Sequence, residues 1–94
     1  MEKAEEFDRA KVLHKLMRTG MWEHKHTSEE NLVKGFPKHK RGDIRSIVDG
    51  LLKKGLLHAK PTRYGRQVSL NIDKKKEIEE IVFRYFGLEY GREV

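Results

Sequence analysis

The spacing of the apolar residues changes from helical to alternating near the middle of the chain, and this change constrains the fold most. Five apolar residues recur at i, i+3, i+4, i+7 and i+8: Ile44, Ile47, Val48, Leu51 and Leu52. This spacing predicts an amphipathic helix with one buried stripe. After Gly55 the apolar residues alternate over 57–60 and 67–72, around a Pro- and Gly-containing segment at 61–66. The two runs predict a β-hairpin with a basic tip, so the fold class is α+β.

Three more helices are expected around this unit. Residues 2–19 carry apolar residues at helical spacing up to Gly20, and a link at 21–25 with an extended segment should follow. A capping box in which the Thr27 hydroxyl accepts from the backbone N–H of Glu30 predicts a short helix over 28–34. Asp73 is the expected N-cap of a last helix over about 74–89. We therefore expect one domain over 1–94, with a core over about 7–72.

The central amphipathic helix is expected to begin near 41–43 and to stop at Gly55. Gly50 lies inside it, where glycine costs about 1 kcal/mol relative to alanine. We therefore expect a close neighbour at Gly50. The polar face of this helix carries Arg45, Ser46, Asp49 and Lys53.

Length and composition exclude several classes of protein. The 94 residues suffice for one small domain with a small core. The chain has no run of about 18 apolar residues that could span a membrane, and no secretion signal, so we expect a cytoplasmic protein. It has no cysteine, which excludes disulfides, zinc ribbons and thiol nucleophiles. There is no Gly-rich phosphate loop, metal triad or paired nucleophile and base, so we expect neither an enzyme nor a cofactor.

Positive charge is concentrated in the middle third of the chain. Residues 34–66 hold ten basic and two acidic side chains, a net charge of +8, whereas residues 1–33 and 67–94 each have a net charge of −1. A local excess of this size attracts polyanions. The alternative is a solvated, lysine-rich face with no partner.

The stretch from Ile44 to Ile72, IRSIVDGLLKKGLLHAKPTRYGRQVSLNI, resembles the winged helix-turn-helix family of transcription regulators, including small archaeal-type ones. It is similar in having an amphipathic helix that ends in an LLKKGLL corner, followed by a hairpin with Gly and Arg at its tip. The order of predicted elements matches over residues 7–86. The resemblance implies a winged-helix fold and sequence-specific binding of double-stranded DNA. The approach segment Phe36–Gly42 is longer and more basic than the short turn usual in the family.

The resemblance also implies which residues would contact DNA. The family's third helix enters the major groove with its N-terminal part nearest the bases, and its hairpin wing would reach the phosphate backbone or the minor groove. In this sequence those positions are Lys38, His39, Lys40, Arg41, Arg45, Ser46, Lys60, Arg63, Tyr64 and Arg66. Arginine can bind a guanine edge through two hydrogen bonds, and serine can contact either base type.

The sequence leaves the assembly and two other functions open. Family members often dimerise through terminal helices, which predicts a homodimer through residues 2–19 and 74–90, with Phe83 off the stripe of the last helix and Tyr90 beyond its end. One alternative function is a winged-helix protein–protein module in a transcription or replication complex. The other is binding of structured RNA. The polar outer face at Arg45 and Ser46 favours DNA. His24 and His26 have the spacing of a metal pair, but no third ligand follows.

Overall fold

The computed structural model describes residues 2–87, which form helices and short strands. The elements are α1 (Glu2–Arg18), β1 (Thr27–Ser28), α2 (Glu29–Lys34), the 3₁₀ helix η1 (Lys38–Lys40), α3 (Arg41–Lys53), β2 (Leu57–Thr62), β3 (Gly65–Leu70), the 3₁₀ helix η2 (Ile72–Lys74) and α4 (Lys75–Phe86). Within the described residues, four α-helices and one three-stranded antiparallel sheet therefore form a small α+β fold. This confirms the predicted α+β class.

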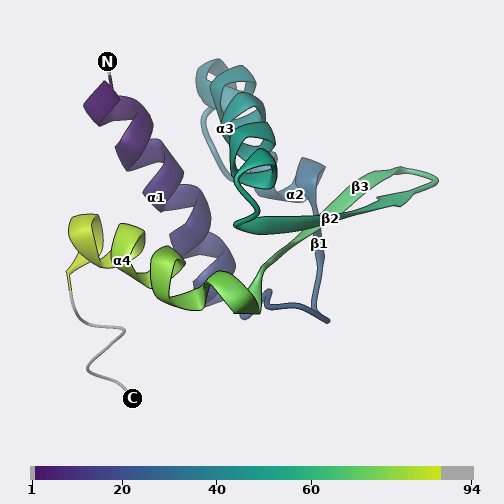
Figure 1. Ribbon diagram of the computed structural model, residues 1–94. Helices are drawn as coiled ribbons and strands as arrows, with labels where there is room; N and C mark the ends of the chain where they lie inside the picture. Colours follow the sequence, from purple (N-terminus) through teal and green to yellow (C-terminus); the bar gives the residue numbers. More distant parts are fainter. Residues whose placement is uncertain (1, 88–94) are drawn as a thin grey trace.

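The sheet has the order β1-β3-β2, so the hairpin strand β3 lies in the middle. Strands β2 and β3 pair from Leu57 opposite Leu70 to Thr62 opposite Gly65, and β1 pairs with the other edge of β3. Only the base of the hairpin is buried, because β2 is exposed from residue 58 to its end. The distal half of the hairpin extends beyond the helices (Figure 1).

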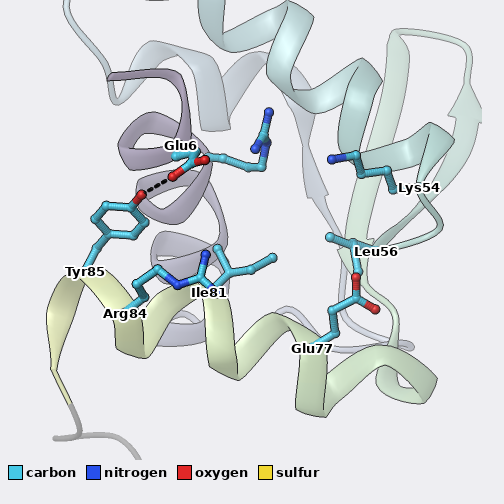
Figure 2. Close-up of a pocket in the computed structure, with 8 residues that line it drawn as sticks. Glu6, Lys54, Leu56, Glu77, Ile81, Arg84 and Tyr85 are labelled. Atoms are coloured by element: carbon cyan, nitrogen blue, oxygen red, sulfur yellow. Dashed lines mark hydrogen bonds between the residues drawn. The ribbon is translucent and has the colours of Figure 1, made fainter. Parts of the chain in front are cut away.

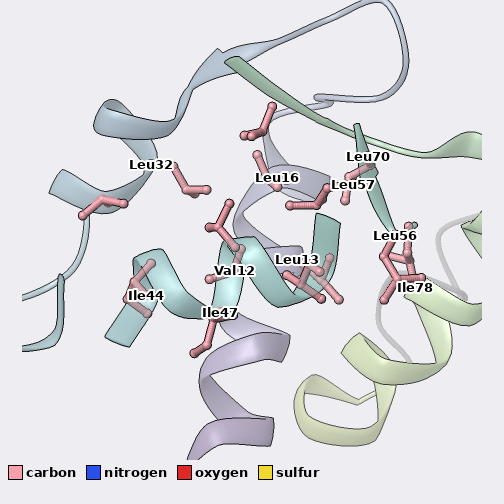
Figure 3. Close-up of a cluster of buried hydrophobic side chains, with 14 of the residues drawn as sticks. Val12, Leu13, Leu16, Leu32, Ile44, Ile47, Leu56, Leu57, Leu70 and Ile78 are labelled. Atoms are coloured by element: carbon pink, nitrogen blue, oxygen red, sulfur yellow. The ribbon is translucent and has the colours of Figure 1, made fainter. Parts of the chain in front are cut away.

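The core lies between α1, α3, α4 and the base of the sheet. The α3 residues Ile44, Ile47, Val48 and Leu51 are buried, as the helical spacing predicts. Side chains from every α-helix and from β2 and β3 join them in one cluster, and Figure 3 shows the members around Val12 and Leu13. The buried stripe of α3 fixes which of its side chains face solvent.

Two helix caps differ from the predictions. Thr27 does not cap α2, because it is paired with Val68 in β1; Ser28 is the N-cap, and its hydroxyl accepts from the Asn31 backbone N–H at 2.9 Å. Asp73 does not cap α4, because residues 72–74 form a 3₁₀ turn first. The Asn71 side chain caps that turn and also donates to the Gly55 carbonyl at 2.8 Å.

The hairpin and α3 also differ from expectation in detail. The strands continue to Thr62 and resume at Gly65, so the turn is only Arg63–Tyr64. Pro61 is accommodated because β2 is an edge strand. Ile72 lies beyond β3 and is exposed. A Cβ at Gly50 would have no atom within 4 Å, so the expected close neighbour is absent.

The terminal helices follow the prediction less closely than α3. Phe7 belongs to the predicted apolar stripe of α1, yet its side chain is 40% exposed. The expected strand at 21–25 is reduced to one bridge between Trp22 and Leu70. Helix α4 ends at Phe86 and Gly87 is its C-cap, one residue into the stretch predicted to be helical; residues 88–89 and Tyr90 lie outside the described residues. Over residues 2–87, no helix combines the length and apolar character needed to cross a membrane.

Candidate nucleic-acid interface

The approach to α3 is a 3₁₀ turn that leads directly into the helix. Residues Lys38–Lys40 form η1, and α3 begins at Arg41, which agrees with the predicted start. Because the apolar stripe is buried, Arg45, Ser46, Asp49 and Lys53 are exposed on the opposite face. Lys38 and His39 are also exposed at the N-terminal end of α3.

A groove lies between the hairpin, the N-terminal end of α2 and Arg45 of α3, and we call it the hairpin groove. It has a volume of about 370 Å³. Its lining comprises Ser28, Glu29, Glu30, Arg45, Thr62, Tyr64, Gly65, Arg66 and Gln67. Tyr64, at the hairpin turn, is 90% exposed. Part of the polar face of α3 and the tip of the hairpin therefore border one surface, at the N-terminal end of α2.

Carboxylates neutralise both arginines of the hairpin groove. The Arg45 guanidinium lies 3.1 Å from a Glu30 carboxylate oxygen. Arg66 donates to Glu29 at 2.7 Å and also forms an ion pair with Asp49. The hydrogen bond to Glu29, followed by the one to Asp49, raises the pKa of Arg66 above its ordinary value. These contacts tie the hairpin to α2 and α3, so neither guanidinium is a free cation.

Lys40 and Arg41 pack the approach segment onto neighbouring helices. Lys40 Nζ lies 2.7 Å from the carboxylate of the buried Asp8 on α1. The Arg41 side chain donates to the carbonyls of Lys34 and Phe36, both at 3.2 Å. It thereby satisfies carbonyls at the end of α2 that lack helical partners. These contacts give both residues a structural role.

The remaining predicted residues divide between two places. Lys38, His39 and Ser46 are exposed at and near the start of α3, and Arg63 and Tyr64 are exposed at the hairpin turn. Lys60 is exposed as well, but it pairs with Gln67, one position along from Arg66. Because side chains alternate along a strand, Lys60 lies on the hairpin face opposite Arg66.

A second cationic groove lies beside α1 and was not predicted. We call it the α1 groove. It has a volume of about 300 Å³. Its lining comprises Lys11, His14, Lys15 and Arg18 of α1, with Gly35, Phe36, Pro37 and Phe86. The signal in the sequence was the i, i+4, i+7 spacing of the three cations, which the net charge of residues 1–33 conceals.

The third cleft, between α1, α4 and the α3–β2 corner, has a mixed lining (Figure 2). It has a volume of about 150 Å³ and combines the cations Arg9, Lys54 and Arg84 with Glu6 and Glu77. The Tyr85 hydroxyl donates to Glu6, and this hydrogen bond raises the pKa of Tyr85. The mixed charges distinguish this cleft from a polyanion surface.

Glu23 ties the loop after α1 to the base of the hairpin. Its φ is +50°, a left-handed conformation unusual for a residue other than glycine. Its carboxylate accepts from the Ile72 backbone N–H at 2.7 Å and contacts His58 Nε2 at 3.1 Å. Mainly because of the Ile72 hydrogen bond, the pKa of Glu23 is lowered. The contact joins three segments that are distant in sequence.

Within residues 2–87, no group of three or more His, Asp or Glu side chains is arranged to hold a metal ion. Comparisons with protein-family models, with curated protein sequences and with solved structures find no match.

Proposed function

We propose that this chain is a winged helix-turn-helix protein that binds double-stranded DNA with sequence preference, as a transcription regulator. In this proposal α2 and α3 form the helix-turn-helix, α3 enters the major groove, and the β2–β3 hairpin is the wing. The observation that carries the proposal is the hairpin groove, which Arg45 of α3 and Tyr64 of the hairpin turn line together. A helix and a ribbon tip that border one surface can contact the same duplex.

The charges on this surface suit different tasks. Lys38 and Arg63 are exposed cations with no carboxylate of the described residues within ion-pair distance, so they suit phosphates. Arg45 is held by Glu30, which fixes its guanidinium, and Ser46 lies beside it on the exposed face of α3. An oriented arginine and a serine at the start of a helix suit base edges.

The experiment that tests this proposal is selection of bound duplexes from a random pool, followed by titration of the selected duplex at several salt concentrations. The proposal predicts an enriched sequence and a log–log salt slope of about −0.9 for each phosphate contacted. An RNA duplex of the same sequence is the control for the RNA alternative, because its A-form major groove excludes a helix. Failure to bind any duplex contradicts the proposal. Tighter binding to RNA favours the alternative.

We also propose that two copies associate through α1 and α4. Aromatic side chains gather where these helices meet: the Phe7 ring centroid lies 5.8 Å from those of Tyr85 and Phe86, and Phe7 is 40% exposed. An exposed aromatic cluster of this kind suits a protein interface. Sedimentation of the wild type and of Phe7→Ser tests it, with a dimer expected for the wild type and a weakened one for the variant. A wild-type monomer at all concentrations contradicts it.

A further inference from the structure

Two lysines of the α1 groove lie against aromatic rings, and no ion pair joins the lysines or the arginine of this groove to a carboxylate of the described residues. Lys11 Nζ and Lys15 Nζ lie 5.9 Å and 5.5 Å from the ring centroid of Phe36, within the range of cation–π attraction. Lys15 also lies across Gly35, where a Cβ would come within 1.6 Å of its Nζ. In the described part of the chain, no carboxylate lies within ion-pair distance of Lys11, Lys15 or Arg18. Ordered ammonium groups with no counter-charge favour an anionic ligand.

The ring contacts indicate which part of a ligand would enter the α1 groove. Both lysines lie near the ring of Phe36, and His14 stacks on Phe86 with centroids 4.3 Å apart. These ring faces are occupied, so they do not offer the free platforms on which single-stranded bases stack. The groove therefore suits phosphates rather than bases.

The α1 groove and the hairpin groove lie at opposite ends of α2. Ser28, Glu29 and Glu30 at the N-terminal end line the hairpin groove, whereas Gly35, Phe36 and Pro37 after the C-terminal end line the α1 groove. Helix α2 has six residues, so it is about 9 Å long at 1.5 Å per residue. That length corresponds to about three base-pair steps at 3.4 Å per step. Pro37, which lines the α1 groove, directly precedes η1 and the exposed Lys38 in the chain.

We propose that the α1 groove binds phosphates of the same duplex that α3 and the hairpin contact, so that the footprint extends across α2 onto α1. The inference rests on the proposed function, because it concerns the extent of that interface. An acidic protein segment could also bind the three cations Lys11, Lys15 and Arg18. The nucleic acid is favoured because the groove residue Pro37 is followed directly by the exposed Lys38, which leads through η1 into α3.

The test compares two triple variants of the full chain by titration of a duplex that contains the selected site. Lys11→Gln/Lys15→Gln/Arg18→Gln removes the cations of the α1 groove. Lys25→Gln/Lys74→Gln/Lys76→Gln removes the same charge from exposed lysines that line none of the three grooves. The inference predicts that the first variant reduces the salt slope by about 2 to 3 units, at about 0.9 per lost phosphate contact. The second should change it by less than about one unit.

A single substitution keeps the test valid if losing both lysines unfolds the chain. Arg18 is exposed and has no ring contact among the described residues, so Arg18→Gln should fold normally and reduce the slope by about one unit. Lys74→Gln is its matched control and should leave the slope unchanged. Equal effects of the α1 variant and its control on the salt slope overturn the inference but not the proposed function. Unchanged DNA binding by the α1 variants does the same, and it indicates that the α1 groove binds an acidic protein instead. A wild type that binds no duplex overturns both.

Discussion

The hairpin groove and the α1 groove border the same short helix, yet they carry positive charge in different ways. In the hairpin groove, Arg45 and Arg66 each face a carboxylate of α2. In the α1 groove, Lys11 lies near the rings of Phe7 and Phe36, and Lys15 lies near the ring of Phe36. A paired guanidinium is oriented but attracts phosphates weakly, whereas an unpaired ammonium attracts them without directional preference. The difference separates a surface suited to recognition from one suited to electrostatic attraction.

The comparison also shows why charge counted along a sequence differs from charge available on a surface. The middle third of the chain has a net charge of +8, but Lys40, Arg45 and Arg66 are paired with acidic residues that mostly come from the first third. Lys11, Lys15 and Arg18 of α1, in contrast, have no carboxylate of the described residues within ion-pair distance. In the folded chain, part of the positive charge that is not paired with carboxylates of the described residues therefore lies on α1 and not in the middle third of the sequence.

The largest expected effect comes from removing the scaffold that supports both grooves. Leu51 is fully buried in α3, so Leu51→Ala should reduce the free energy of unfolding by about 2–5 kcal/mol through lost burial and a cavity. Urea denaturation followed by circular dichroism measures this loss. Lys53→Ala, at an exposed position of the same helix, is the control and should stay within about 0.5 kcal/mol of the wild type.

The next effect tests whether the hairpin groove is the one that recognises bases. Arg45→Ala should cost about 1–3 kcal/mol of discrimination at one base pair and little at the others. Titration of single-base variants of the selected duplex measures it. Uniform weakening across all duplexes would show that Arg45 only contacts phosphates, as we propose for the α1 cations.

Glu30→Gln should make the hairpin groove resemble the α1 groove, because it removes the carboxylate that pairs with Arg45. Without its carboxylate partner, Arg45 becomes an unpaired cation like those of the α1 groove. We expect affinity for every duplex to rise and discrimination between bases to fall. The same titrations measure both quantities, and a loss of affinity would contradict the view that Glu30 competes with phosphates.

A variant of Arg66 tests whether its ion pairs hold the hairpin against α2 and α3. Arg66→Gln removes the ion pairs to Glu29 and Asp49, and we expect a loss of about 1 kcal/mol, at the upper end for a partly exposed pair. Amide hydrogen exchange of the hairpin should accelerate because the hairpin is then less tied to α2. Unchanged exchange in the hairpin would show that these ion pairs do not hold it.

Arg63 should have a smaller effect on binding than Arg45. It is exposed at the hairpin turn and has no ion pair among residues 2–87. Arg63→Ala should weaken binding to all duplexes alike and reduce the salt slope by about one unit. If Arg63→Ala and Arg45→Ala show the same pattern, the distinction between recognition and attraction fails.

The smallest effect concerns pH and the base of the hairpin. The folded state lowers the pKa of Glu23, chiefly through the Ile72 N–H, so the unfolded chain takes up its proton first as the pH falls. This contribution to stability is complete above the ordinary carboxyl pKa and is lost as the pH falls through the lowered folded value. Thermal melts should therefore show a shallower acid dependence for Glu23→Gln than for the wild type. Identical pH profiles would contradict the assignment.

Local patterns predicted the elements of the fold well. The five-residue stripe of α3 and the alternation in β2 and β3 reflect burial against one core, so both could be read from the sequence. Thr27 and Asp73 failed as caps because each capping role depends on neighbouring structure: β1 pairing displaces one, and a 3₁₀ turn displaces the other. A capping motif does not predict a competing strand pairing, as at Thr27, or a competing local turn, as at Asp73.

The candidate site was less predictable than the fold. Exposure of Arg45, Ser46 and the residues of the hairpin turn follows from periodicity, and the structure agrees. The partners of Lys40 and Arg66 do not follow, because Asp8 and Glu29 are 32 and 37 residues away in sequence. The α1 groove depends in the same way on α2 and α4 packing beside α1. Long-range ion pairs and grooves between elements can be identified only once the three-dimensional fold is known.

The most direct test of the account is the map of backbone amide chemical shifts when the isotope-labelled protein is titrated with the selected duplex. The account predicts shifts that cluster at residues 38–46 and 62–66, with a second cluster at 11–18 from the α1 groove. Shifts confined to the N-terminal half of α4 and the cleft of Figure 2, or no shifts at saturating duplex, would contradict it.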